Sequence, residues 1–312
     1  MTSPSDSSAR RIKSQVRLIR ARLQSLAAIL RLKFFRLLSK TSPDQGNDAA
    51  VVVTVTTYHL RFEQAKISIE SILQQKTNVA FAVHLYLSRS DLDILGNNAL
   101  SSLDSLKKRG LRVTVVDENL RSYKKLVYAL AEYPEKTLVT ADDDVCYPRY
   151  WLDQLLQTSQ RFPHAVVCFR GHRLSVDRAG ELHSYGEMMQ GDVASLALRP
   201  SYSLMPTGVS GILYPPGSLA DIAVDKEMFL RLAPSADDVW FKVAAMLKGT
   251  KAILVSPRNR HFPHVPGSQD DSLFELNVAG GRNDVQMAAC FSEFDVALRE
   301  LRNEAASGAD TP

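Results

Sequence analysis

The sequence predicts an α/β fold: a mostly parallel, doubly wound sheet flanked by helices, preceded by an N-terminal amphipathic helix. Between residues 51 and 141, four short apolar runs alternate with three segments of helical periodicity. Each of the four runs ends in a polar cluster, as expected where parallel strands end at one ligand crevice. Before them, residues 10 to 40 carry a long apolar stripe at helical spacing.

Composition and cysteine usage describe an ordinary globular protein. The chain has 312 residues, of which 45% are hydrophobic and 23% charged, enough for one large domain or two small ones. Its three cysteines are far apart and form no CxxC pair. This pattern argues against a disulfide framework or a structural zinc site, and a reducing compartment fits best.

The net charge of +4 is unevenly distributed. Residues 1 to 46 contain ten Lys or Arg against two Asp, a net of +8, which leaves −4 for residues 47 to 312. The body is therefore mildly acidic, and this argues against a nucleic-acid partner. The basic N-terminal segment needs its own explanation.

Residues 1 to 46 are predicted to form a basic amphipathic helix and a linker, with Pro43 and Gly46 in the linker. The helix has no Gly or Pro between residues 9 and 42, and no acid between 7 and 43. Apolar residues recur every three or four positions at Ile12, Val16, Ile19, Leu23, Leu26, Leu30, Phe34 and Leu37.

The charges in this helix exclude most of its possible roles. The apolar stretches are too short for a transmembrane span, and arginines interrupt them too often for a signal peptide. In a coiled coil of identical chains the positive flanks would repel each other. Two interpretations remain: residues 10 to 40 lie on an anionic membrane surface, or the helix packs on the acidic body.

The first half of the body, residues 47 to 150, shows the alternation most clearly. Val51 to Val55 is a β-branched run, the strongest strand signal in the chain. We expect strands over residues 51–55, 81–87, 111–116 and 138–141, and helices over residues 62–75, 93–109 and 122–133. No GxGxxG follows the first strand and no P-loop is present, so both nucleotide fingerprints are missing.

The second half, residues 151 to 296, is less regular. Glycine and proline bracket residues 206 to 217, which predicts a loop and strand that another group approaches closely. Residues 297 to 312 are expected to hold the end of the last helix and a disordered tail. We expect helices over residues 151–162, 227–232, 236–247 and 285–301, and strands over residues 165–170, 212–214 and 252–255.

Asp142, Asp143 and Asp144 follow the fourth predicted strand directly. Three adjacent carboxylates repel each other unless a cation or a set of donors neutralises them. A hard divalent ion, Mg²⁺ or Mn²⁺, is the simplest such cation, and it usually brings a phosphate with it. The triplet thus indicates an enzyme acting on a metal-bound, phosphorylated substrate, against the plainer alternative of a solvated turn.

In its order of features, the chain resembles the GT-A glycosyltransferases, which have a Rossmann-like sheet, and especially the family-two-like enzymes of bacterial polysaccharide biosynthesis. The resemblance covers roughly residues 50 to 295. It rests on Val55 to Tyr58, Glu118 to Leu126, the Asp triplet with Pro148, Pro206 to Gly217, and Ala236 to Asp238. It implies a hexosyltransferase-type enzyme that moves a sugar from a UDP- or GDP-sugar to a polysaccharide, lipid-linked or other glycan acceptor.

The resemblance also implies roles for individual residues. The triplet would match the DxD motif, in which Asp144 would bind Mn²⁺ or Mg²⁺. Asp142 and Asp143 would hold the ribose or a metal-bound water. Asp142 and His264 are also candidate ligands of the metal. Residues 47–150 would be the nucleotide-sugar-binding half and 151–296 the acceptor-binding half. Donor contacts would come from Thr56, Thr57, Tyr58, Arg61, Lys124 and Lys125, although the lysines could equally lie on a solvated helix face.

Asp237 and Asp238 resemble the acidic pair that precedes the acceptor-side helix. Asp238 would be the general base of an inverting reaction and Asp237 would hydrogen-bond the acceptor. The alternative is a pair of acids placed favourably at a helix N-terminus. Further on, Asn283, Asp284 and Gln286 are interpreted as the N-cap region of the last helix.

Together with the basic helix, the resemblance predicts a cytoplasmic protein, peripheral on the inner face of the cell membrane. Two rival functions stay open. A haloacid-dehalogenase-like phosphatase also places an Asp motif after a strand. In those enzymes, however, Thr or Val stands where this chain has Cys146, and the motif follows the first strand, not the fourth. A non-catalytic membrane adaptor would have no need for both acidic clusters.

Overall fold

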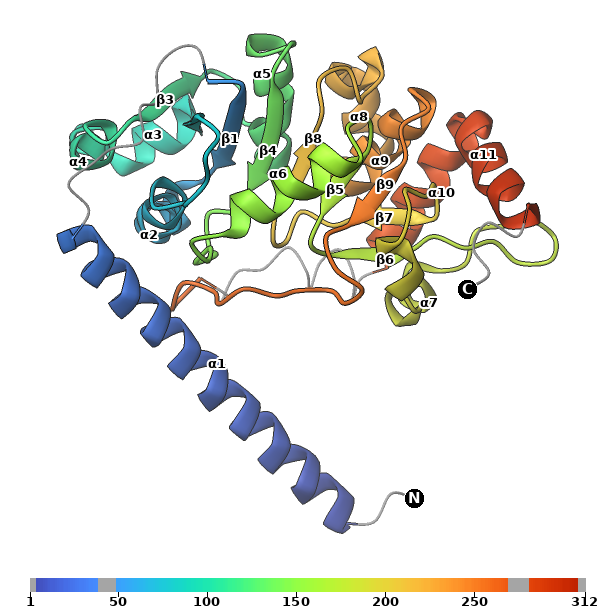
Figure 1. Cartoon of the computed structure of the whole chain (residues 1–312), viewed down its shortest axis with the longest axis horizontal. Coiled ribbons are helices and arrows are strands. Elements are labelled where there is room, and N and C mark those ends of the chain that lie inside the picture. Colours follow the sequence, from blue (N-terminus) through green and yellow to red (C-terminus); the bar gives the residue numbers. More distant parts are fainter. Residues whose placement is uncertain (1–3, 39–48, 269–280, 308–312) are drawn as a thin grey trace.

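A computed structural model describes residues 4–38, 49–268 and 281–307 of the chain (Figure 1). Seven strands form one sheet in the order β3-β2-β1-β4-β8-β5-β9. Their bounds are β1 Val51–Thr56, β2 Phe81–Ser88, β3 Leu111–Val116, β4 Thr137–Ala141, β5 Val166–Cys168, β8 Ile212–Tyr214 and β9 Ala252–Leu254. Only β8 runs antiparallel to its neighbours, so the predicted mostly parallel α/β sheet is confirmed.

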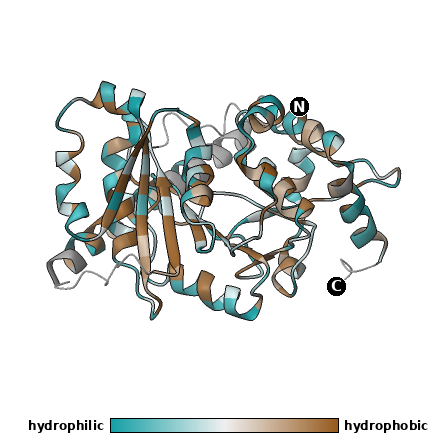
Figure 2. Cartoon of the chain, turned by 90° about the horizontal axis from the view of Figure 1, so that it is seen from above, coloured by the Kyte–Doolittle hydropathy of each residue, from teal (hydrophilic) through white to brown (hydrophobic). Residues whose placement is uncertain are grey.

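Helices cover both faces of this sheet. Alternate residues of β1 point to opposite faces: Val52 belongs to the same hydrophobic cluster as residues of α5 and α9, whereas Val51 and Val53 share a second cluster with residues of α2 and α6. Hydrophobic strands lie at the centre of the molecule in Figure 2. The helices are α1 Pro4–Leu38, α2 Phe62–Leu73, α3 Arg89–Leu95, α4 Asp104–Lys107, α5 Lys124–Glu132, α6 Trp151–Arg161, α7 Tyr185–Gln190, α8 Lys226–Leu232, α9 Asp237–Leu247, α10 Arg282–Glu293 and α11 Asp295–Ala306.

Three predicted elements differ from the structure. The helix expected over 93–109 is divided into α3 and α4, because Gly96 takes a left-handed φ of 81° after α3. The last helix is two helices that meet at Phe294, and α11 continues to Ala306, while residues 308–312 lie outside the described residues. Residues 171–206, where the sequence predicted no helix or strand, contain α7 and a separate antiparallel pair, β6 Gly171–Arg173 and β7 Leu204–Pro206.

The predicted N-terminal helix is present as α1, which projects from the body in Figure 1. It contacts the body through its C-terminal half, where the Gln74 side-chain amide donates a hydrogen bond to the Leu32 carbonyl at 3.1 Å. Ser25 is buried and Ala28 is half-buried on the same face of the helix. The linker expected over residues 41–48 lies outside the described residues.

The register of the parallel strands brings their carboxyl ends together. Val55 of β1 pairs with Ala141 of β4, and Thr56 pairs with Tyr86 of β2. The residues that follow these strands therefore meet at one edge of the sheet. Residues 57–58 and the Asp triplet lie at that edge.

Candidate functional site

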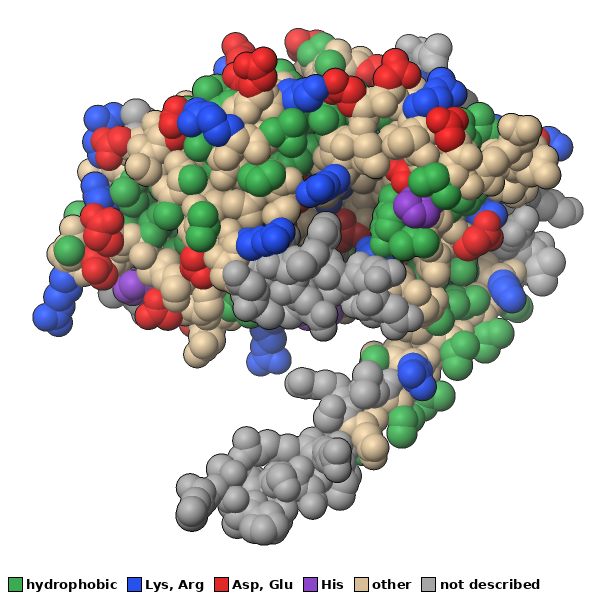
Figure 3. Space-filling view, turned by 180° about the vertical axis from the view of Figure 1, so that it is seen from behind, with side chains coloured by type: hydrophobic (Ala, Val, Ile, Leu, Met, Phe, Trp, Pro, Cys, Tyr) green, Lys and Arg blue, Asp and Glu red, His purple; other side chains and the backbone are tan. Residues whose placement is uncertain are grey.

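A cavity of about 730 Å³ lies at the carboxyl edge of the parallel strands. The space-filling view in Figure 3 shows a hollow in the surface with acidic side chains in its depth. Every site residue expected from the sequence lines the cavity: Thr56, Thr57, Tyr58, Arg61, Lys124, Lys125, Asp142, Asp143, Asp144, Asp237, Asp238 and His264. Residues more than 180 positions apart in the chain are thus brought into one site.

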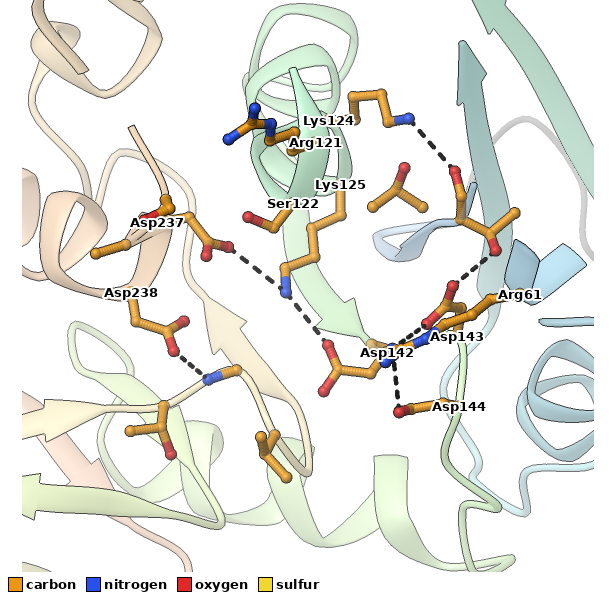
Figure 4. A pocket seen from close by; sticks show the side chains of 18 of the residues that line it. Arg61, Arg121, Ser122, Lys124, Lys125, Asp142, Asp143, Asp144, Asp237 and Asp238 are labelled. Carbon is orange, nitrogen blue, oxygen red and sulfur yellow. Dashed lines mark hydrogen bonds and ion pairs between the residues drawn. The ribbon is translucent and has the colours of Figure 1, made fainter. Parts of the chain in front are cut away.

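The carboxylates of the Asp triplet point in two directions (Figure 4). The Thr57 hydroxyl donates to Asp143 Oδ2 at 2.6 Å. Arg61 Nη1 lies 3.2 Å from Asp144 Oδ2 and 3.5 Å from Asp143 Oδ1. Asp142 instead faces Lys125, with its Oδ1 3.3 Å from the ammonium. The triplet is therefore a buried charge cluster with defined partners, which excludes the solvated-turn alternative.

Negative charge dominates this part of the cavity. Burial, together with the neighbouring Asp144 and Asp142 carboxylates, raises the pKa of Asp143 to about 6 against the opposing effects of Thr57 and Arg61. Burial also raises the pKa of Asp142, and the Asp144 carboxylate adds to that shift. Additional positive charge at this position would stabilise the ionised triplet.

Lys125 joins the two acidic clusters. Its ammonium lies 3.3 Å from Asp142 Oδ1 and 3.6 Å from Asp237 Oδ2. Burial alone would lower its pKa, but Asp142, Asp237 and Asp238 together hold the pKa well above its usual value. Lys125 is therefore a permanent cation inside the site, and the solvated-face alternative does not hold for this residue.

Lys124 is buried as well, but its ammonium turns away from the triplet. It lies 3.3 Å from the Thr57 carbonyl oxygen and 3.4 Å from Asp91 Oδ2. In this way it ties the end of β1 to the segment after β2. Lys124 thus lines the cavity and also fixes the wall beside the triplet.

Asp91 is a cavity residue that sequence reasoning did not select. His59 Nδ1 lies 2.9 Å from its Oδ1, Asn119 donates to its Oδ2 at 3.2 Å, and Ser88 also hydrogen-bonds it. Burial alone would raise the pKa of Asp91, but the bonds from Ser88 and His59 outweigh burial and lower it. The sequence feature that could have identified Asp91 is the polar cluster that follows β2, which includes this residue.

Asp237 and Asp238 open α9 on the opposite wall of the cavity. Asp238 Oδ2 accepts a hydrogen bond from the Gly208 amide at 2.9 Å. Burial and the adjacent Asp237 raise the pKa of Asp238 to about 7, against the opposing effects of Lys125 and Gly208. A carboxyl group with such a pKa exchanges protons readily near neutral pH.

The segment from residue 206 to 217 does approach other groups closely, as the sequence predicts. Gly211 has a φ of 93°, and a Cβ placed there would lie 2.5 Å from the Trp151 ring. The indole of Trp151 donates to the Ser210 carbonyl at 2.7 Å. A Cβ at Gly208 would lie 3.1 Å from both Asp238 Oδ1 and Lys125 Nζ. This backbone therefore forms part of the wall beside Asp238.

His264 faces the triplet, because residues 263–265 run antiparallel to residues 144–146. The Cys146 amide donates to the Pro263 carbonyl at 2.8 Å, and the Val265 amide to the Asp144 carbonyl at 2.7 Å. His264 Nδ1 lies 3.7 Å from Asp144 Oδ2, and this contact is the main cause that raises its pKa. Within residues 4–38, 49–268 and 281–307, no three His, Cys, Asp or Glu side chains are gathered as a ready-made metal site.

The N-cap interpretation of residues 283–286 is wrong. Helix α10 begins at Arg282 after Gly281, which is in the left-handed region. Asp284 Oδ1 accepts from the Tyr185 amide at 2.6 Å, and Asn283 lines the cavity. Asp284 thus fastens α10 to the first turn of α7 and does not cap α10 itself.

One further group of residues that lines the cavity was not selected from the sequence. It comprises Arg170, His172, Tyr185 and Ser235. They come from loops and short elements of the second half. Their proximity depends on long-range packing, which local patterns do not reveal.

No protein-family model and no curated protein sequence matches the chain. Solved structures similar to it include Staphylococcus aureus TarS 1-349 (12% identity over 83% of this chain and 73% of that one, TM-score 0.47). Another is the mannosyltransferase PcManGT from Pyrobaculum calidifontis in complex with GDP-Man and Mn²⁺ (16% identity over 94% of this chain and 86% of that one, TM-score 0.47). TarS 1-349 in complex with UDP is a third (13% identity over 83% of this chain and 73% of that one, TM-score 0.46). Overlaps of this extent assign neither a family nor an activity to this chain.

Proposed function

We propose that the protein is a metal-dependent, inverting glycosyltransferase that uses a nucleoside-diphosphate sugar, UDP- or GDP-linked, and a glycan or lipid-linked acceptor. One observation carries the proposal. Two buried acidic clusters, Asp142–Asp144 and Asp237–Asp238, line the same cavity and are joined by Lys125. A diphosphate leaving group needs a cation at one end of the site, and an attacking hydroxyl needs a base at the other.

The residues at the triplet fit a divalent ion. Mg²⁺ and Mn²⁺ in phosphate sites are held by one or two protein ligands together with substrate oxygens. Asp144 and His264, whose Oδ2 and Nδ1 atoms lie 3.7 Å apart, would provide these ligands. Asp142 is the less suited ligand, because it is paired with Lys125. When bound, the ion supplies Lewis-acid stabilisation of the charge that develops on the diphosphate.

The first half of the chain would hold the donor. Thr56, Thr57 and Tyr58 follow β1 at the cavity, and Asp91 and Asn119 lie beside them. These polar groups suit a nucleoside. Arg61 would reach the diphosphate by exchanging its present carboxylate partners for phosphate oxygens, which bind a guanidinium equally well.

Asp238 would act as the base. Its Oδ2 is held by the Gly208 amide, so Oδ1 is the atom that would take the proton of the acceptor hydroxyl. As that oxygen attacks the anomeric carbon, the bond between the sugar and the diphosphate breaks and the configuration inverts. Lys125 remains protonated and stabilises the carboxylates on both sides of the transferred sugar.

An activity panel tests this proposal against its two rivals. The full chain is incubated with UDP- and GDP-sugars, with and without Mn²⁺, and release of nucleoside diphosphate is measured. Asp144→Asn should abolish release, whereas Asp104→Asn, an exposed surface change, should not. Hydrolysis of p-nitrophenyl phosphate without sugar-nucleotide turnover would identify a phosphatase, and inactivity in all assays would favour the adaptor.

Helix α1 would place the enzyme on the inner face of the cell membrane. Helix α1 contacts the body through the face that carries Ser25 and Ala28, whereas its apolar stripe faces away from the body. The exposed fraction of these side chains is between 53% and 67% for Val16, Ile19, Leu23, Leu26, Leu30 and Phe34. None of the described helices has both the length and the hydropathy needed to cross a bilayer.

Charge complementarity identifies the surface that α1 would contact. With 3.6 residues per turn, Arg20 and Arg31 flank the stripe on one side, and Arg22 and Lys33 flank it on the other. An apolar stripe between two rows of cations, without any acid, fits an anionic lipid surface. This orientation would keep the catalytic body next to a lipid-linked acceptor.

A further inference from the structure

The cavity is divided into an acidic part and a basic part. Asp91, the Asp triplet and the pair on α9 line one part. Arg170, His172 and His261 line the other, next to Tyr185 and Asn283. The proposed function accounts for the acidic part and leaves the basic part without a role.

Arg170 is held in place with hydrogen-bonding capacity to spare. Its Nη1 donates to the Thr207 hydroxyl at 2.8 Å, and its carbonyl accepts from the Thr207 amide at 3.0 Å. Its Nε is buried and has no hydrogen-bond partner among the described residues. A buried guanidinium N–H without an acceptor is costly, and an oxyanion in the cavity would satisfy it.

His172 stands beside this guanidinium and is 3% exposed. Its ring packs edge-on against Tyr185, with the ring centroids 5.3 Å apart. Burial, Arg170 and His261 together lower the pKa of His172 to about 4. Burial, Arg170 and His264 likewise lower the pKa of His261. Both imidazoles therefore favour the neutral form, and the Arg170 guanidinium supplies the positive charge of this group.

Hydrogen bonds between two separate segments hold this basic group together. Asn259 exchanges two hydrogen bonds with the backbone of Gly171, at 3.0 and 2.9 Å. The Arg260 amide donates to the Phe169 carbonyl at 3.1 Å. The segment that carries His261 is thereby fixed against the strand that carries His172. The arrangement belongs to the folded framework and does not depend on a single flexible side chain.

The basic group lies next to Asp238. Thr207, which contacts Arg170, precedes Gly208, whose amide holds the Asp238 carboxylate. An anion bound by Arg170 would therefore sit close to the hydroxyl that Asp238 deprotonates. It would lie on the wall of the cavity that carries Asp238, the acceptor side in the proposed function.

We propose that the acceptor carries an oxyanion, a phosphate or a carboxylate, near its attacking hydroxyl, and that Arg170 and His172 bind it. The assignment of the anion to the acceptor rests on the proposed function, whereas the anion site itself does not. Arg170 would supply a charged, forked donor, and His172 would gain a proton from the proximity of the bound anion.

The test uses the full chain and three probes: glycerol 1-phosphate, glucuronate and uncharged glucose. The Cε1–H resonance of His172, assigned with His172→Gln, is followed by NMR through a pH titration at increasing probe concentrations. We expect the phosphate or the carboxylate to raise the pKa of His172 and glucose to leave it unchanged. The anion that binds more tightly identifies the acceptor group.

Arg170→Gln should lower the affinity for the anionic probe at least tenfold. Arg170→Lys, which keeps the charge, should lower this affinity by an intermediate factor. Arg173→Gln is the matched control, since that side chain bonds Ser195 and the Asp192 carbonyl outside the cavity. Titration of GDP and UDP with Mn²⁺ into Arg170→Gln should match the wild type. If Arg170→Gln does not fold, the affinities of Arg170→Lys and Arg173→Gln for the anionic probe are compared instead, and only Arg170→Lys should bind it more weakly than the wild type.

Three outcomes would overturn the inference: a His172 resonance that ignores both anions, equal affinities in Arg170→Gln and the wild type, or displacement of the anionic probe by GDP or UDP. The last would assign the basic group to the donor diphosphate. A wild type that binds neither GDP nor UDP would instead refute the proposed function. The probe titrations would still show whether Arg170 and His172 bind an anion.

Discussion

The Lys125 ammonium lies 3.3 Å from Asp142 Oδ1, and this ion pair connects α5 to the end of β4 inside the cavity. Both groups are removed from bulk solvent, so each depends on the other for its charged state. The same ammonium faces Asp237 at 3.6 Å. One cation therefore balances carboxylates on both walls of the site.

Replacing this cation should cost stability. Lys125→Met would leave Asp142 and Asp237 buried without their counter-ion, and we expect a loss of about 3–5 kcal/mol in the free energy of unfolding at pH 7. The pKa of Lys125 is raised in the folded protein, so its contribution is fully present below pH 10 and is lost only as pH rises through the folded value. Urea denaturation measures the change.

Lys226→Met provides the comparison for Lys125→Met, because Lys226 pairs with Glu118 on the surface, where both side chains are exposed. Its cost should stay below about 1 kcal/mol. Equal and small losses in the two variants would show that Lys125 is not an essential counter-ion.

The rate of sugar transfer should rise with pH. Asp238 must be ionised to accept a proton, and its pKa is raised to about 7, so activity is low below that value and levels off above it. The apparent pKa belongs to the coupled pair with Asp237. Asp238→Asn should lower the rate by about 10²–10⁴-fold and remove the rising limb of the pH profile.

Initial rates of nucleoside diphosphate release between pH 5 and 9 measure this limb. Asp221→Asn, at an exposed position before α8, should retain both the rate and the limb. An unchanged limb in Asp238→Asn would assign the base to another group.

Gly211→Ala should destabilise the wall beside Asp238. The new Cβ would meet the Trp151 ring at 2.5 Å, and alanine would also have to adopt a φ of 93°. We expect a loss of roughly 3 kcal/mol, the sum of about 1–2 for the backbone and 1–3 for overpacking. Thermal unfolding measures the shift.

Gly217→Ala separates the two contributions in Gly211→Ala. Its φ is 66°, but nothing lies within 4 Å of a Cβ at this position. It should therefore show the backbone cost alone, about 1 kcal/mol. A loss in Gly211→Ala no larger than this would mean that the Trp151 contact adjusts freely.

Membrane binding through α1 should depend on both the stripe and its flanking charges. Arg20→Gln with Arg22→Gln should weaken binding to vesicles containing phosphatidylglycerol about thirty-fold, since each cation contributes about 1 kcal/mol. Serine at Ile19, Leu23 and Leu26 should abolish binding. Co-sedimentation at two salt concentrations measures both effects, and binding should weaken at high salt.

The matched control for α1 is a variant with serine at Ala21 and Gln24, two exposed positions away from the stripe. This variant should bind the vesicles as the wild type does. Vesicle binding that survives loss of the stripe would refute this mode of attachment. Binding equally tight to uncharged phosphatidylcholine vesicles would refute the electrostatic part.

The sequence predicted the first half of the sheet well, because β-branched runs and Gly or Pro stops are local signals. It also selected Asp142 to Asp144 and the pair on α9, since adjacent carboxylates are visible without a structure. It could not predict that Lys124 and Lys125 are buried, because their partners are distant in the chain: Thr57 after β1, Asp91 in α3, Asp142 after β4 and Asp237 in α9. The break at Phe294 has no Gly or Pro to mark it.

Arg170 and His172 were missed for a related reason. They are only two positions apart, but a single Arg and a single His beside an apolar run form no recognisable motif. The pairing of β6 with β7 and the return of residues 259–261 bring Thr207 and His261 to them. Charge clusters assembled from distant segments leave no periodic or adjacent pattern for sequence reasoning to detect.

The central claim is that the acidic triplet holds a cation which in turn holds a diphosphate. Anomalous diffraction at the manganese edge, from crystals of the full chain grown with Mn²⁺ and either UDP or GDP, tests it most directly. The account predicts a manganese peak in contact with Asp144 and the nucleotide diphosphate, and none in Asp144→Asn crystals. Nucleotide bound without a peak at Asp144, or a cavity without either ligand, would contradict it.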